Sequence, residues 1–309
     1  MEDTRQFLRE LGLPGGDAHD LPTSGKRFPD GAQYRVEIPS TEGPTALAAV
    51  IETADRLGVI VHRVSQGSGV MLQSDNEIRE MARLAAARNM EISLFARPAA
   101  GWDVGAMAVS PAGQVVASRL RGQDQLIYCL EDVRRAAELG IRSVLLADEG
   151  ALWVAGEMRR AKILPSDMQF KISVMMGSTN PASIRMLERL GANTFNIPTD
   201  LTLAQIAAIR QAVDIPLDVY VEAPDDIGGF VRYYEIPELV RVGAPVYLKF
   251  GLRNAPNIYP SGGHLESTAV ALSRERVRRA SLGLDLLRRY APDAIGSRLP
   301  AAGLAVPVL

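Results

Sequence analysis

The chain has 309 residues, of which 47% are apolar and 23% are charged, so it can bury a large core and is neither disordered nor peptide-like. Thirty-four basic against thirty-six acidic residues leave a formal charge of −2, which provides no field suited to nucleic acid or to an anionic membrane. The single cysteine, Cys129, excludes an intramolecular disulfide, a four-cysteine zinc site and a cysteine-held iron–sulfur cluster within one chain.

The sequence shows no signal for export or for membrane insertion. No apolar run approaches the roughly 18 to 20 residues of a membrane span, and residues 1–30 lack the apolar segment of a signal peptide. We therefore expect a cytoplasmic protein with no nucleic-acid partner, no membrane partner and no iron–sulfur cluster.

Residues 1–30 are rich in Gly, Pro and Asp and predict an N-terminal extension. From residue 31 onward, apolar runs of strand length alternate with helical segments. The predicted strands are residues 34–38, 59–64, 92–96, 143–147, 170–175, 194–197, 217–221 and 246–250. The predicted helices are residues 44–57, a segment that begins near 74, and residues 124–139, 150–161, 180–190, 202–213, 236–242 and 266–290.

Local signals mark several of these boundaries. Gly58 follows the first helix, where a C-cap favours glycine, and Ser74 with Glu77 predicts a capping box at the start of the second. After the third strand, residues 97–122 predict a long insertion that contains a hairpin, with 107–109 and 115–117 as its two arms.

Eight strand–helix repeats predict an α/β fold of the TIM type, a (β/α)8 barrel that forms a single domain over residues 31–309 and includes the C-terminal helix and tail. The strands are apolar over most of their length, which is typical of parallel strands buried on both faces. A doubly wound open sheet is the alternative. Its dinucleotide-binding form is disfavoured because no G-x-G-x-x-G follows the first strand.

In such a barrel the active site lies where the strands end and the loops to the following helices begin. The polar residues at these positions are Glu37, Ser40, Arg63, Gln66, Arg97, Asp148, Glu149, Ser178, Asn180, Asn196, Glu222, Asp225, Asp226, Lys249 and Arg253. From this set, the expected substrate-binding residues are Glu37, Arg63, Arg97, Asn196 and Arg253. A slip of one residue in register would place His62 where Arg63 is expected.

Lys249 lies late in an otherwise apolar strand, where its ammonium group is expected to be partly desolvated. We predict a catalytic role for it, as an electrophile, a Schiff-base amine or a clamp for a substrate carboxylate; the alternative is a structural ion pair with Glu222. Lys171 comes early in its strand, toward the opposite end of the barrel, where a stabilising role is expected.

Three carboxylates complete the expected catalytic set. Glu222 ends the seventh strand, and Asp148 and Glu149 follow the fourth. The same three residues are candidates to hold a divalent metal such as Mg²⁺ through oxygen ligands; alternatively, Asp148 or Glu149 caps the following helix. A histidine-rich zinc site is not expected, because no H-x-x-x-H pair occurs among His19, His62 and His264.

Glycines after the seventh and eighth strands, together with Arg253, predict a cradle for phosphate or carboxylate; they are Gly228, Gly229, Gly251, Gly262 and Gly263. Trp102, in the long insertion, is expected to cover the mouth of the barrel, to pack beneath the insertion or to lie in a subunit contact. The apolar tail 299–309 and the N-terminal extension are candidates for the contact of a homo-oligomer.

Several runs between residues 54 and 222 share the pattern of a known family. The clearest are Ala136-Ala137-Glu138-Leu139-Gly140, Thr179-Asn180-Pro181-Ala182-Ser183 and Leu187-Glu188-Arg189-Leu190-Gly191-Ala192. With these runs, about residues 54–222 resemble the collagenase-like peptidase family of unassigned catalytic type, the thirty-second family of the unknown-type peptidases. The resemblance implies a related barrel.

The chain departs from that family after the seventh strand. There the family signature leads from an acidic and an aromatic residue to Gly-small-aliphatic-Cys, but the segment from Asp218 to Asp226 has neither the glycine nor the cysteine. The iron–sulfur, RNA-hydroxylation and quinone-synthesis chemistry of some members is therefore not implied, and no nucleophile–base pair of a peptidase is visible. The resemblance therefore implies a related barrel whose residues at the mouth differ from those of the family.

Three functions remain open from the sequence. The first is an enzyme of the lyase, aldolase or isomerase type that acts on a small anionic metabolite at the mouth of the barrel. The second is a peptidase-like hydrolase, with Glu222 activating water. The third is a barrel that binds a ligand without converting it.

Overall fold

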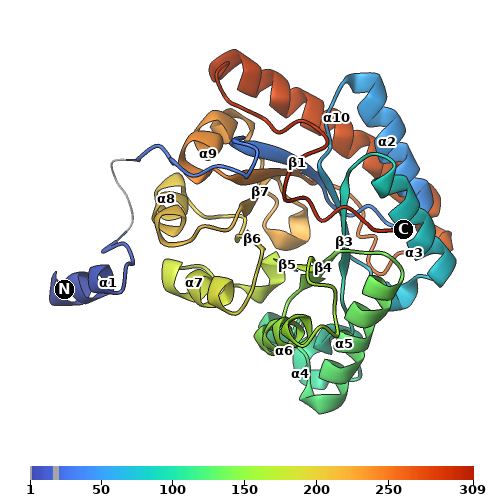
Figure 1. Ribbon diagram of the computed structural model, residues 1–309. Helices are drawn as coiled ribbons and strands as arrows, with labels where there is room; N and C mark the ends of the chain where they lie inside the picture. The colour runs from blue at the N-terminus through green and yellow to red at the C-terminus, as the bar shows by residue number, and fades with distance from the viewer. Residues whose placement is uncertain (1, 17–20) are drawn as a thin grey trace.

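The eight predicted strands form a closed parallel barrel. The computed structural model describes residues 2–16 and 21–309. Its strands are β1 Tyr34–Ile38, β2 Arg63–Gln66, β3 Glu91–Phe95, β4 Ser143–Leu146, β5 Gln169–Ile172, β6 Thr194–Asn196, β7 Leu217–Glu222 and β8 Val246–Phe250. Each strand pairs with the next, and β8 pairs with β1 to close the ring (Figure 1). The fold is therefore of the TIM type, and the open-sheet alternative is excluded.

Helices surround the ring of strands and follow them in alternation (Figure 1). They are α2 Pro44–Leu57, α3 Asp75–Ala86, α5 Gly122–Glu138, α6 Glu149–Arg160, α7 Pro181–Arg189, α8 Leu203–Ala212, α9 Ile236–Gly243 and α10 Glu266–Tyr290. Short 3-10 turns lie in the loops, at Val70–Leu72, Val174–Met176, Asp225–Ile227, Tyr233–Glu235 and Gly263–Leu265.

The boundary signals in the sequence act as predicted. Gly58 caps α2 in a left-handed conformation with φ of 64°, and Ser74 and Glu77 form a capping box at the start of α3. The bounds of β2 were predicted wrongly: residues 59–62 approach the barrel, and the ladder begins only at Arg63. Val59 and Val61 are buried without belonging to the ladder, which explains why the apolar run was misleading.

The predicted hairpin inside the insertion is wrong. The segment after β3 instead forms a 3-10 turn at Ala100–Trp102, a short helix α4 at Ala106–Val109 and a 3-10 turn at Pro111–Val116. Ser110 accepts a hydrogen bond from the backbone N–H of Gly113 at 3.1 Å, and this cap starts a helical turn where the hairpin needed extended residues.

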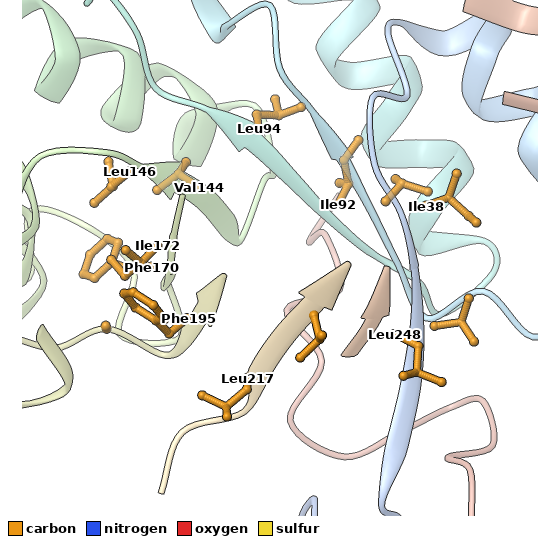
Figure 2. Packing of buried hydrophobic residues seen from close by; sticks show 14 of the residues in the cluster. Ile38, Ile92, Leu94, Val144, Leu146, Phe170, Ile172, Phe195, Leu217 and Leu248 are labelled. Atoms are coloured by element: carbon orange, nitrogen blue, oxygen red, sulfur yellow. The ribbon is translucent and has the colours of Figure 1, made fainter. Parts of the chain in front are cut away.

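The two faces of the strands differ in chemistry. Alternate residues such as Ile38, Ile92 and Leu248 join helix side chains in the main apolar cluster, part of which Figure 2 shows. The residues between them are mostly polar and buried: Arg35, Glu37, Arg63, Ser65, Glu91, Ser93, Lys171, Thr194, Asp218, Tyr247 and Lys249. The expectation that the strands are apolar on both faces is therefore wrong, because the inner face lines a polar barrel interior.

The C-terminal segment and residues near position 30 close the amino-terminal end of the barrel. Arg35 donates hydrogen bonds to Ser297 Oγ at 2.9 Å and to the carbonyl of Ala302 at 2.6 Å, and it pairs with Asp30 at 3.2 Å. The helix α1 Glu2–Glu10 lies to one side of the barrel (Figure 1). Residues 17–20, which include His19, lie outside the described residues. None of the helices in the described part of the chain is long and apolar enough to span a membrane.

Candidate functional site

A cavity of about 320 Å³ opens at the carboxyl ends of the strands. Ser65, Asn196, Tyr220 and Lys249 reach it from the strands, and Trp102 reaches it from the insertion. The insertion thus forms part of the cavity wall. A mouth cavity with a few convergent polar groups is the usual form of a ligand site in this architecture.

Lys249 is a buried cation at this cavity. Its side chain is 2% exposed, and Nζ lies 3.2 Å from Oε1 of Glu37. With the Asn196 amide oriented to satisfy both of its polar ends, the amide oxygen accepts from Nζ at 2.9 Å. The ammonium also lies 4.3 Å from the ring centroid of Tyr220. These contacts fix the ammonium in place and leave it among the groups that line the cavity.

Glu37 is the common partner of the charged groups beneath Lys249. It accepts hydrogen bonds from Arg63 Nε and Ser65 Oγ, both at 2.7 Å, and it also pairs with Lys171. Burial opposes the ionisation of Glu37, yet Arg63, Lys171 and Lys249 together hold its pKa well below the usual range. Glu37 is therefore a carboxylate that balances cations inside the barrel. The structure does not place it in the cavity lining, where a substrate-binding residue was expected.

Asp218 is the second internal carboxylate, and it completes contacts that cross the barrel. It pairs with Arg63 at 2.5 Å and with Lys171 at 3.0 Å. Burial and the neighbouring Arg63 lower the pKa of Lys171 to about 8, although Asp218 and Glu37 oppose this shift. Three cations thus face three carboxylates inside the barrel: Arg63, Lys171 and Lys249 against Glu37, Glu91 and Asp218.

Arg63 belongs to this balanced set and not to the cavity. Its guanidinium group is fully buried, lies 3.6 Å from the ring centroid of Tyr247, and is held by carboxylates on several sides. His62, the alternative at this position, points elsewhere: its Nδ1 accepts from the backbone N–H of Val36, and its Nε2 lies 3.0 Å from the carbonyl of Ser297. Neither residue lines the cavity, so the structure does not bring Arg63 to the place where a substrate-binding residue was expected.

Arg97 does line the cavity, as the sequence suggested. Its guanidinium carbon lies 3.8 Å from the ring centroid of Trp102 and 4.3 Å from that of Phe95. Burial lowers the pKa of Arg97 to about 10. Trp102 therefore lies in the wall of the cavity and holds Arg97 through its ring face.

Glu222, which was expected to be catalytic, does not line the cavity. The strand pairing shifts register between Tyr220 and Glu222, so a bulge turns the last side chain of β7 away from the mouth. Its carboxylate accepts from Tyr233 Oη at 2.8 Å, from the backbone N–H of Arg253 at 3.0 Å and from Arg279 at 3.2 Å. Glu222 joins the loops after β7 and β8 to α10. It is not the structural partner of Lys249 that the alternative supposed.

Asp148 and Glu149 have structural roles as well. Asp148 caps α6 by accepting from the backbone N–H of Ala151 at 3.1 Å, which is the alternative that the sequence left open. Glu149 is half-exposed and pairs with Arg119. Neither lines the cavity. The expected metal set of Asp148, Glu149 and Glu222 is not assembled, because the described residues contain no group of three acidic, histidine or cysteine side chains placed to hold a metal ion.

Arg253 is also outside the cavity. It is exposed and pairs with Asp225 at 3.1 Å. Gly251, one of the glycines of the expected anion cradle, has a packing role instead: a Cβ there would lie 2.7 Å from the carbonyl of Glu222. The sequence-predicted binding residues that reach the cavity are thus Arg97 and Asn196.

Tyr220 and Tyr259 are among the cavity residues that were missed from the sequence. Tyr220 lies two positions after Asp218, so strict alternation along β7 was a signal that could have found it. Tyr259 comes from the loop after β8, which has no periodic pattern. Its hydroxyl contacts Ser40, and its ring packs where a Cβ on Gly67 would lie 2.4 Å away. Glycine at position 67 is therefore required for this wall of the cavity.

Comparisons with known proteins agree with this architecture. Residues 114–223 match the model of peptidase family U32, which confirms the resemblance seen in the sequence. A putative fructose-1,6-bisphosphate aldolase from Coccidioides immitis is similar in fold, with 14% identity over 92% of this chain and 94% of that one and a TM-score of 0.52. The U32 peptidase Mk0906 aligns with 17% identity over 67% of this chain and 74% of that one, with a TM-score of 0.39. No curated protein matches the chain.

Proposed function

Starting from a (β/α)8 barrel whose residues 114–223 match peptidase family U32, we propose that the chain is an enzyme for a small anionic metabolite, which it binds at the mouth cavity. The observation that carries the proposal is Lys249, a buried ammonium group at the cavity with its position fixed by Glu37, Asn196 and Tyr220. A fixed cation in a water-poor cavity favours negative charge on a ligand more strongly than a solvated lysine does.

The proposed role of Lys249 is that of an electrophile. Glu37 remains ionised beside it and holds the end of the lysine side chain in place at 3.2 Å. An ammonium donates hydrogen bonds to a carboxylate or carbonyl oxygen and stabilises the oxyanion that develops when a proton or a carbon group leaves the neighbouring carbon. This chemistry is that of a lyase, an aldolase or an isomerase.

The proton-transfer group in this proposal is Asp226. It lies in the turn Asp225–Ile227 after β7 and is the acidic residue among the described groups that line the cavity. Its carboxylate takes the part first expected of Glu222, which the bulge in β7 turns away. A carboxylate in the same cavity as a fixed cation can remove a proton while the cation holds the resulting negative charge.

A binding protein without catalysis is the second candidate. The observation that favours it is that the other predicted acids, Asp148, Glu149 and Glu222, are used in a helix cap and in ion pairs. A peptidase-like hydrolase is less well supported. Its water-activating residue was expected to be Glu222, which does not line the cavity.

The test uses a panel of small carboxylates and phosphorylated metabolites, with binding read by calorimetry and conversion read by NMR. We expect Lys249→Met to lose binding and Asp226→Asn to retain binding while losing conversion. Glu222→Gln is the control and keeps both. Conversion that survives in both Lys249→Met and Asp226→Asn would contradict the assigned roles, and binding by the wild type without any conversion would favour the second candidate.

A further inference from the structure

We propose that Arg97 forms a second anion subsite in the mouth cavity, so that the ligand is a small dicarboxylate with one carboxylate at Lys249 and the other at Arg97. This inference rests on the proposed function, because Lys249 takes the first anionic group. It adds the chemical class of the ligand, which neither the fold nor the family match provides.

Two aromatic rings contact the guanidinium group of Arg97. Trp102 lies against it at 3.8 Å and Phe95 at 4.3 Å, measured from the guanidinium carbon to the ring centroids. The stem of Arg97 passes Gly69, where an added Cβ would lie 3.3 Å from its Cβ. These contacts hold the side chain in place, and its N–H groups remain available to a polar partner.

Arg97 is partly buried, and it differs from the fully buried arginines in having no oxygen partner among the described residues. Within residues 2–16 and 21–309 it makes no ion pair, and its Nε is buried without a hydrogen bond. The buried arginines each donate to at least one oxygen: Arg35, Arg63, Arg210, Arg232 and Arg276. Arg97 thus brings to the cavity a partly buried positive charge that no carboxylate pairs with, and an anionic ligand can supply the missing acceptor.

The charges that line the cavity favour a ligand with two negative groups. Among the described lining residues the charged ones are Arg97, Lys249 and Asp226. Lys249 already has Glu37 as a carboxylate partner, whereas Arg97 has none. The cavity therefore contains Lys249, which has a carboxylate partner, and Arg97, which forms no ion pair among the described residues.

The chemistry of a guanidinium group favours a carboxylate at Arg97. A carboxylate is planar and accepts two parallel hydrogen bonds from a guanidinium edge. The same edge still attracts phosphate by charge, so the experiment includes inorganic phosphate as a separate arm.

The test measures the affinity of malonate, succinate and glutarate, of propionate as the monocarboxylate, and of inorganic phosphate, by calorimetry. We expect the best dicarboxylate to bind at least about tenfold more tightly than propionate, a difference of about 1.4 kcal/mol. Arg97→Gln should reduce this advantage to within twofold and leave propionate binding unchanged, and Arg97→Lys should retain part of it. Arg253→Gln, an arginine at the same end of the barrel outside the cavity, is the matched control and should change nothing.

The outcomes separate the subsite from the proposed function. If propionate binds and depends on Lys249 but a second carboxylate adds nothing, or if the dicarboxylate advantage survives Arg97→Gln, the subsite is wrong and the proposed function stands. If phosphate binds more tightly than every dicarboxylate and depends on Arg97, the ligand class is wrong. If none of these anions binds to the wild type, both proposals fail.

Discussion

Single residues inside the barrel decide what Lys249 can do. Glu37 was expected to bind substrate, but it is fully buried and contacts Lys249, Lys171, Arg63 and Ser65. It is therefore a positioning residue that acts through Lys249. The signal for this role was present in the sequence, since charged residues alternate with apolar ones along β1, but the expectation of strands buried in apolar surroundings on both faces hid it.

Glu37 and Asp218 form a matched pair for testing this role. Glu37→Gln and Asp218→Asn each remove one buried carboxylate, and each should destabilise the protein by about 3–5 kcal/mol because a buried cation loses a partner. Only Glu37 contacts Lys249. The affinity for propionate should therefore change in Glu37→Gln, because this variant alters a contact that holds the Lys249 ammonium group in place. Asp218→Asn should keep the wild-type affinity, and equal changes of affinity in the two variants would argue against a positioning role.

His62 gives a prediction for stability in mild acid. Burial lowers the pKa of His62 to about 4 from an ordinary value of 6.5. Between these values the unfolded chain binds a proton that the folded chain does not, so the free energy of unfolding falls as the pH falls from 6.5 to 4, by about 3 kcal/mol in total. His62→Gln removes this contribution. In urea unfolding, the free energy of unfolding should fall less for His62→Gln than for the wild type between pH 6.5 and 4. Identical decreases in the two proteins would exclude a neutral buried histidine.

The ends of strands and helices show where prediction from sequence succeeds and where it stops. The end of α2 at Gly58 and the start of α3 at Ser74 follow from capping residues, which are local properties of the sequence. The direction of Glu222 depends on a bulge between Tyr220 and Glu222, which arises from pairing with β8 and has no local signal. Position at a strand end was therefore predictable, but exposure to the cavity was not.

The role of Glu222 as a link between elements is open to direct measurement. Its carboxylate ties the turns after β7 and β8 to Arg279 on α10. Glu222→Gln keeps an acceptor but loses the charge, and we expect a loss of about 1–3 kcal/mol in the free energy of unfolding. Anion binding at the mouth should be unchanged. A stable Glu222→Gln protein with impaired binding would show that the carboxylate acts in the site after all.

At the scale of the whole molecule, the strands have an apolar core on their outer side and a charged core on their inner side. The apolar cluster lies between the strands and the helices, and it can be read from periodicity in the sequence (Figure 2). The barrel interior is ionic, with three cations against three carboxylates that come from distant parts of the chain. Such cross-barrel pairs depend on closure and register, so sequence alone could nominate Lys249 and Glu37 but could not pair them.

The most direct test of the account is a crystal structure of the protein with malonate or succinate bound. We predict density for the ligand in the mouth cavity, with one carboxylate within hydrogen-bond distance of Lys249 Nζ and the other along the edge of the Arg97 guanidinium group. A ligand bound away from Lys249, or a cavity that stays free of the ligand at saturating concentration, would contradict the account.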